Sequence, residues 1–186
     1  MSFSEAAQDL LSIGEQEDKF FGKYRGIVLQ NADPEFRGRI QVQVAGVVMP
    51  PSTWAEPCVP VAGMQCGFFA VPPIGAGVWV EFEQGDPDYP IWVGGFWGTP
   101  AEPPLTAKAA ATPTPDILMQ TIGNNSITIY GAPGLGVTLA AGPVVSPTSP
   151  RIMITQAGIV ITDGMGGMIN VAGGVVTVNL GALIVK

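Results

Sequence analysis

Charged residues are concentrated in the first half of this 186-residue chain, and this asymmetry constrains the fold more than any other sequence feature. Thirteen of the 15 acidic residues and five of the 8 basic residues precede residue 105. The rest of the chain retains only Lys108, Asp116, Arg151, Asp163 and Lys186. Because ordinary protein surfaces are roughly a quarter to a third charged, residues 105–186 cannot solvate a free-standing domain. We expect them to bury surface against further copies of the same chain.

Alternating strand-like segments follow one another between residues 20 and 98. Every Phe and Trp, and every Tyr except Tyr130, precedes residue 105, which suits a compact core in this half. The turn-forming sequences NADPEFRG and GDPDYP separate some segments, and Pro72 and Pro73 forbid a continuous ladder. Several short strands with glycine at the bends are typical of a small closed barrel such as an OB-fold. The predicted strands are Tyr24–Gln30, Arg39–Val47, Glu56–Ala62, Phe68–Val71, Gly75–Glu83 and Ile91–Trp97.

Short alternating runs separated by glycine-rich corners fill residues 117–186, a segment that we term the needle. Each run places two apolar side chains on one face, as Ile127 with Ile129 and Ile159 with Ile161 illustrate. Such strands cannot enclose a core alone, so the pattern predicts a β-helix or β-prism intertwined from three chains. Residues 99–116, rich in Pro and Ala, are predicted to be an extended linker. The runs are ILMQTI, SITIY, GVTLA, RIMIT, GIVIT, MINV, VVTVN and ALIV.

The first 19 residues form an acidic segment whose apolar residues suit either a short amphipathic helix or a frayed tail. They lack the features of a signal peptide, and no stretch of the sequence approaches the ~18 apolar residues that span a bilayer. We therefore expect synthesis and assembly in the cytoplasm. The net charge of −7 argues against nucleic acid as a partner, since binding to phosphates requires clustered Lys and Arg. Cys58 and Cys66 are predicted to be buried thiols rather than a disulfide or zinc ligands.

Candidate catalytic and metal-binding residues are few, and the sequence predicts no catalytic, cofactor-binding or metal-binding site. Glu81 and Glu83 share a strand face at about 7 Å, a separation found in glycoside hydrolases, but alternation also places acids on any wet face. The chain contains no histidine to activate a nucleophile. Asp163 precedes the corner GMGG and is a weak calcium candidate. Arg37 and Arg39 flank a hairpin turn, where they either pair with Glu35 or an acidic neighbouring subunit or are solvated.

Several segments resemble the baseplate spike proteins of contractile phage tails and of related injection systems, including type VI secretion. They are YRGIVLQNADPEFRGRIQVQV, WAEPCVPVAG and VPPIGAGVWVEFEQGDPDYPIWVGGFWG, and the needle is similar in character. The resemblance implies a homotrimer with an OB-like domain in the baseplate hub and a β-helical needle that leads an inner tube through a target membrane. It also implies a hub protein at the N-terminal side and a PAAR-type tip protein at the C-terminal end. Relatives with an inserted lysozyme domain or a histidine-ligated iron tip differ from this chain.

Two other classes of function remain open on the residues alone. An envelope-degrading hydrolase would require a cleft with perturbed carboxyl groups near Glu81, Glu83, Asp86 or Asp88. A receptor-binding fibre or adhesin would require exposed aromatic platforms on the needle, where Tyr130 is the only aromatic residue. We expect a mechanical spike that carries no cofactor, assembled in a virion tail or injection particle and entering the target envelope on contraction.

Overall fold

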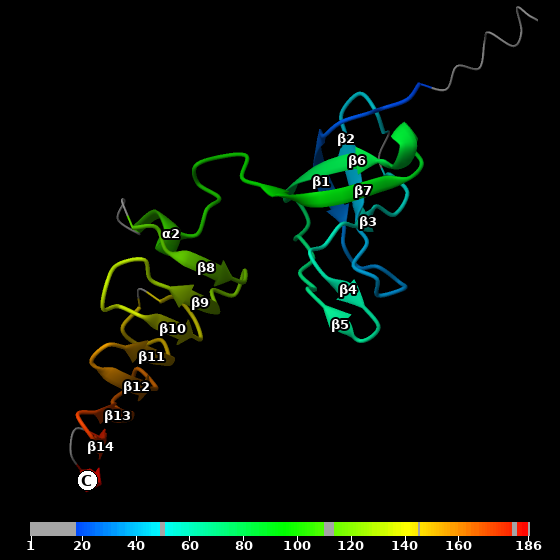
Figure 1. Ribbon diagram of the computed structural model, residues 1–186. Helices are drawn as coiled ribbons and strands as arrows, with labels where there is room; N and C mark the ends of the chain where they lie inside the picture. The colour runs from blue at the N-terminus through cyan, green and yellow to red at the C-terminus, as the bar shows by residue number, and fades with distance from the viewer. Residues whose placement is uncertain (1–17, 49–50, 110–113, 145, 180–181, 186) are drawn as a thin grey trace, which may run out of the picture. The chain divides into compact units, whose positions relative to one another are not determined.

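A computed structural model describes residues 18–48, 51–109, 114–144, 146–179 and 182–185, and the chain divides into two compact units. The N-terminal unit extends to Pro100 and the C-terminal unit begins at Ala101. Both consist of short β-strands (Figure 1). The predicted all-β character is confirmed for the described residues, and the predicted N-terminal helix lies outside them.

A five-stranded curled sheet forms the N-terminal unit, in the order β2-β1-β6-β7-β3. All its pairs are antiparallel except β3 with β7, where Glu56 lies opposite Ile91 and Pro57 opposite Trp92. Between β3 and β6 the chain forms a separate small hairpin, β4 with β5. The bounds are β1 Tyr24–Gln30, β2 Gln41–Val44, β3 Glu56–Pro57, β4 Ala62–Gly63, β5 Cys66–Gly67, β6 Gly77–Phe82, the 3-10 turn η1 Glu83–Gly85, and β7 Pro90–Phe96.

Strict alternation along the strands builds the core of this unit. In β6 the side chains of Val78, Val80 and Phe82 point inward, while the residues between them are half exposed. Trp92 enters the same core and donates its indole N–H to the Gly38 carbonyl oxygen at 3.1 Å. The prediction that Val78, Val80 and Phe82 share one buried side of β6 is therefore confirmed. The other buried core residues are Val28, Ile40, Val42, Val44 and Ala55.

Two predicted strands of the N-terminal unit differ from the structure. The segment predicted as Glu56–Ala62 is not one continuous strand: it pairs with β7 only over β3, and its last residue belongs to β4, since Pro57 and Pro60 have no N–H to donate. The segment 68–71 is not a strand, and the preceding residues pair instead as the β4–β5 hairpin. Gln65 closes that hairpin with a φ of 55°, which turns the chain before Phe68 is reached.

The C-terminal unit is an eight-stranded antiparallel sheet in which each strand pairs with its neighbours in sequence, from β8 to β15. All eight predicted needle strands are present. They are β8 Ile117–Gln120, β9 Ser126–Ile129, β10 Val137–Ala140, β11 Arg151–Thr155, β12 Gly158–Thr162, β13 Met168–Ala172, β14 Val175–Val178 and β15 Leu183–Val185. A short helix, α2 (Leu105–Ala109), lies within the segment predicted to be extended. It follows two prolines and contains good helix formers.

The two cysteines are exposed and free, so the prediction of buried thiols was wrong for the single chain. Cys66 lies in the β4–β5 hairpin, whose strand residues are all exposed, and Cys58 lies just beyond β3. Among the described residues, no helix has the length and apolar character needed to cross a membrane.

Candidate assembly surface

Two continuous rows of described apolar side chains cross the C-terminal sheet, one over all eight strands and the other from β8 to β14. Cross-strand register aligns them, because Leu139 lies opposite Ile127 on one side and Ile152 on the other, and the pairing continues in step to the last strand. We call this surface the apolar face. One row is Met119, Ile127, Leu139, Ile152, Ile161, Ile169, Val178 and Leu183, and the other is Ile117, Ile129, Val137, Ile154, Ile159, Val171 and Val176.

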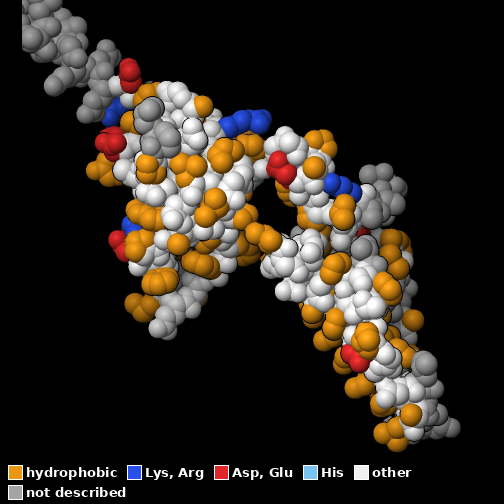
Figure 2. Space-filling view, turned by 180° about the vertical axis from the view of Figure 1, so that it is seen from behind, with side chains coloured by type: hydrophobic (Ala, Val, Ile, Leu, Met, Phe, Trp, Pro, Cys, Tyr) orange, Lys and Arg blue, Asp and Glu red, His pale blue; other side chains and the backbone are white. Residues whose placement is uncertain are grey.

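The apolar face is uncovered in a single chain, whereas the opposite face is partly buried. Ile154 retains 50% of its accessible surface, and Ile127, Ile161 and Ile169 are similarly exposed. On the opposite face Thr128 is completely buried. An ordinary two-faced sheet buries its apolar side and hydrates its polar side. In this sheet the apolar side is exposed and the polar side is partly buried, and apolar side chains follow the length of the unit (Figure 2). A single chain therefore does not bury the face that an ordinary sheet would bury.

A loop joins β10 to β11 and is described over residues 141–144 and 146–150, where Ala141 donates its N–H to the Pro150 carbonyl oxygen at 3.0 Å. Arg151 ties it by donating from its guanidinium group to the carbonyl oxygens of Val144, Ser146 and Ser149. Gly142 donates its N–H to Asn125 Oδ1 at 3.0 Å, which anchors the start of the loop. The side chain of Arg151, one of the few charges of this half, thus organises backbone rather than facing a partner.

Two hydroxyl groups on the opposite face, Ser126 Oγ and Thr128 Oγ1, are buried without a hydrogen-bond partner. An unsatisfied buried hydroxyl costs about 1–3 kcal/mol. We therefore expect Thr128→Val, which keeps the shape of the side chain, to raise the free energy of unfolding by about 1 kcal/mol per chain. Thermal melting of the full chain checks this. Thr138→Val, on the same face, is measured as a second variant. A lower melting temperature for Thr128→Val would show that the hydroxyl has a partner.

Glycine corners let the strands reverse within very little space. Gly136 has a φ of +68°, and a Cβ built there would lie 1.9 Å from the Ile154 carbonyl oxygen. Asp163 shapes another corner, where its Oδ1 accepts the N–H groups of Met165 and Gly167 at 2.7 and 2.9 Å. Within the described residues no group of three or more metal-ligating side chains forms. Asp163 therefore has a structural role in the turn, and the calcium suggestion gains no support.

A buried ion pair organises the loop between β1 and β2 in the N-terminal unit. Arg39 donates to Asp33 at 2.7 Å and also contacts Glu35 at 3.1 Å. The guanidinium group holds the pKa of the Asp33 carboxyl well below its usual range, and backbone N–H donors act in the same direction against burial. Asp33 in turn raises the pKa of Arg39. The predicted pairing with Glu35 is present, but the solvated alternative is wrong for Arg39, which is buried.

The lowered pKa of Asp33 makes the stability of this unit depend on acid. Because the folded pKa lies below the unfolded one, the stabilisation is complete above the ordinary Asp pKa of about 3.9 and is lost as the pH falls below it. We expect Asp33→Asn to lower the melting temperature at pH 7 by several degrees and to flatten its decline below pH 4. Glu83→Gln, an exposed carboxylate elsewhere in the unit, is the control. If the melting temperatures of Asp33→Asn and of the unchanged chain declined equally with falling pH, the lowered pKa of Asp33 would not be a source of the acid dependence.

Of the carboxylates considered for catalysis, Glu83 and Asp86 line one small cavity of about 210 Å³ beside Lys19, whereas Glu81 and Asp88 do not line it. Glu81 lies on β6 and forms an ion pair with Lys23, whereas Glu83 begins the turn η1. Asp86 accepts the backbone N–H of Asp88 at 3.0 Å and lies 3.9 Å from Lys19. Arg37, outside this group, bridges Glu35 and Glu56 on the surface. Among these carboxylates, Glu81 serves a surface ion pair and Asp86 serves a turn.

Family comparisons match both units in chain order. Residues 24–97 match the type VI secretion system/phage-baseplate injector OB domain, and residues 116–184 match the phage baseplate V C-terminal trimerisation domain. The chain belongs to the phage-baseplate and type VI secretion spike family. This membership confirms the predicted OB-like barrel and gives the apolar face its context, because it lies on the domain through which the family trimerises.

A curated relative matches part of the chain. The actin cross-linking toxin VgrG1 of Vibrio cholerae serotype O1 is 43% identical over 63 residues. The match covers 34% of the chain and 6% of the toxin, so the chain spans a small fraction of that relative's length.

Sequence reasoning found the apolar rows but missed two features of the sites. The alternating pattern does not indicate the tied loop between β10 and β11, although Arg151 next to a Ser- and Pro-rich stretch could have indicated it. The buried Asp33–Arg39 pair was also missed, since charges beside turn-forming residues are usually solvated.

Proposed function

We propose that three copies of this chain assemble into the central spike of a baseplate, with the three apolar faces turned inward to form one shared interior. The two unbroken apolar rows on a domain of the trimerisation family support this most directly. Fully burying one Ile or Val side chain contributes about 1.5–3 kcal/mol. Summed over the two rows and three chains, even partial burial offsets the loss of freedom on association.

The work of this spike is mechanical. Contraction of a sheath would drive the trimer into the target membrane, where a rod with paired strands and few charges resists bending. We propose a hub protein on the N-terminal side, a PAAR-type tip protein at the needle end, and assembly in the cytoplasm before the needle enters the target envelope. Force transmission needs no bond chemistry, so we propose that the chain is not an enzyme. Two of the candidate acids already have structural roles, since Glu81 pairs with Lys23 and Asp86 holds a turn.

Solution mass together with particle function tests this proposal. Sedimentation equilibrium of the purified chain should give three times the 19.3 kDa of one copy. Contractile particles assembled without the chain should lose the ability to permeabilise target cells and regain it when the chain is restored. A folded single-chain species at micromolar concentration would refute the trimer, and full permeabilisation without the chain would refute the piercing role.

A further inference from the structure

An exposed phenylalanine projects from the N-terminal unit in a conformation that bulky residues rarely adopt. Phe36 is 86% exposed and has a φ of 56°, in the left-handed region. Such a conformation is strained for a bulky side chain and persists only when the surroundings enforce it. Strain of this kind clusters at functional sites.

Asp33 holds the loop that carries Phe36. Its carboxylate accepts the backbone N–H groups of Glu35, Arg37 and Arg39 at 3.0, 2.8 and 3.2 Å, and its carbonyl oxygen accepts that of Phe36 at 3.1 Å. The Arg39 guanidinium group locks the same carboxylate. The loop is therefore fixed before any partner arrives, and a preorganised aromatic anchor binds without a large loss of conformational freedom.

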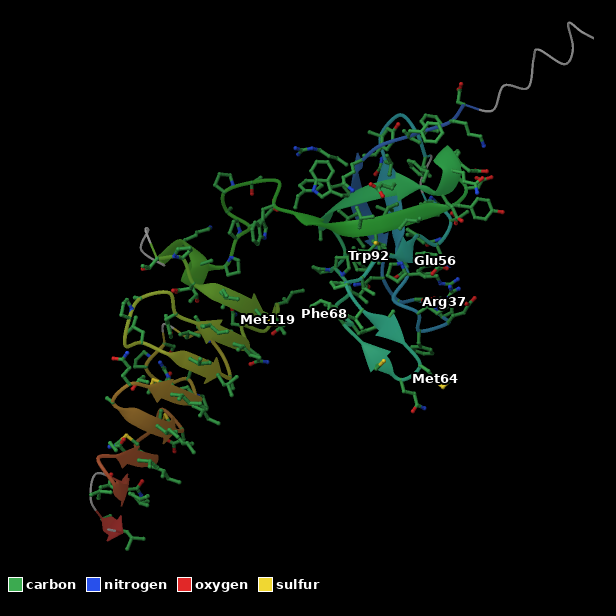
Figure 3. The ribbon with its side chains drawn as sticks, in the orientation of Figure 1. Arg37, Glu56, Met64, Phe68, Trp92 and Met119 are labelled. Carbon is green, nitrogen blue, oxygen red and sulfur yellow. The ribbon has the colours of Figure 1, made fainter. Side chains whose placement is uncertain are left out.

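Phe36 is part of a larger apolar surface. It borders a groove of about 530 Å³ together with Val61, Phe68 and Phe69. The Phe69 ring packs against Gly38, 3.2 Å from where a Cβ would lie. Figure 3 shows Met64 and Phe68 projecting from the hairpin side of this surface. We call the exposed set the exit-end patch: Phe36, Val61, Met64, Phe68 and Phe69.

The patch lies at the end of the barrel from which the chain leaves for the needle. Strand β3 runs parallel to β7, so the segment after Pro57 advances toward the end of β7 and returns to Gly77, which lies opposite Phe96. The loop after β1 reaches the same end, since Ile27 also lies opposite Gly77. The first described residues lie at the other end, where Phe20 donates its N–H to the Gly85 carbonyl oxygen.

We propose that the exit-end patch binds the N-terminal unit of a neighbouring copy of this chain, with Phe36 as its anchor. This inference rests on the proposed trimer, because a shared needle tethers three such units near their exit ends. Tethering through a short linker raises the local concentration to the order of millimolar, enough for a modest apolar patch to remain paired. Asp33 is a positioning residue in this contact, since it acts through the loop.

Photo-cross-linking of the full chain tests the contact. Replacement of Phe36 or Phe69 by p-benzoylphenylalanine should yield covalent dimers and trimers on irradiation, detected by mass after denaturation. The matched control is the same replacement at Tyr89, which is 63% exposed but follows η1 at the opposite end. We expect a severalfold lower yield of cross-linked species at Tyr89.

Each outcome decides between the two proposals. A native trimer without cross-links at Phe36 and Phe69, or with equal yields at Tyr89, overturns the exit-end contact and leaves the trimeric needle standing. A monomeric chain overturns both. Cross-linking at Phe36 that falls severalfold when Asp33→Asn is added to a chain that remains trimeric supports the positioning role. An unchanged yield removes that role.

Discussion

Ile161→Asn is expected to abolish or severely weaken trimer formation, although in the single chain this side chain is 44% exposed. In the proposed trimer it lies between Ile152 and Ile169 on the buried apolar face. Each copy would lose about 1.5–3 kcal/mol of apolar burial. It would also place an amide in the interior at a further cost of about 1–3 kcal/mol. The change occurs three times in the trimer, so sedimentation should show monomers or aggregates.

Val160→Asn is the matched control, one residue earlier on the opposite face of the same strand. In the single chain Val160 is more covered than Ile161, so the isolated chain alone would suggest that Val160→Asn is the more damaging change. The trimer predicts the reverse order. If Val160→Asn dissociates the assembly while Ile161→Asn remains trimeric, the inward orientation of the apolar face is wrong.

Gly136→Ala is the second change with a large expected effect. The added Cβ would meet the Ile154 carbonyl oxygen, a backbone atom that moves only if β11 moves. Gly136 also closes the turn, because Tyr130 donates its N–H to the Gly136 carbonyl oxygen at 2.9 Å. We expect a loss beyond the roughly 0.5–3 kcal/mol of an ordinary substitution, seen as a lower melting temperature and a weaker trimer.

Gly134→Ala separates the clash from the cost of left-handed backbone. Gly134 lies in the same turn with a φ of +87°, yet a Cβ there would meet only Gln156 Oε1 within 4 Å, at 3.8 Å. It should therefore lose only the roughly 1–2 kcal/mol of a left-handed alanine. Equal melting temperatures for the two variants would mean that the close approach at Gly136 is relieved cheaply.

Local patterns predicted the needle strands well because each strand pairs with the strands next to it in sequence. The run GIVIT becomes β12, and its flanking glycines turn the chain, so no distant contact is needed to place it. Phe68–Val71 was predicted as a strand on its apolar character, but the β4–β5 hairpin formed before it and left Phe68 and Phe69 exposed. The predicted burial of Cys58 and Cys66 was wrong for a related reason. Apolar neighbours in the sequence do not ensure that other residues cover a side chain in the folded structure.

The sequence alone determined the division into a charged, aromatic-rich barrel and a nearly uncharged needle, because composition limits which surfaces can face water. It also determined the period of two that places Ile159 and Ile161 on one face. Only the tertiary structure decided that fifteen described side chains of this kind align in two rows, since register depends on hydrogen bonds between strands. It alone revealed the Asp33 clamp that presents Phe36, because that arrangement depends on a buried ion pair, and burial is a property of the folded chain.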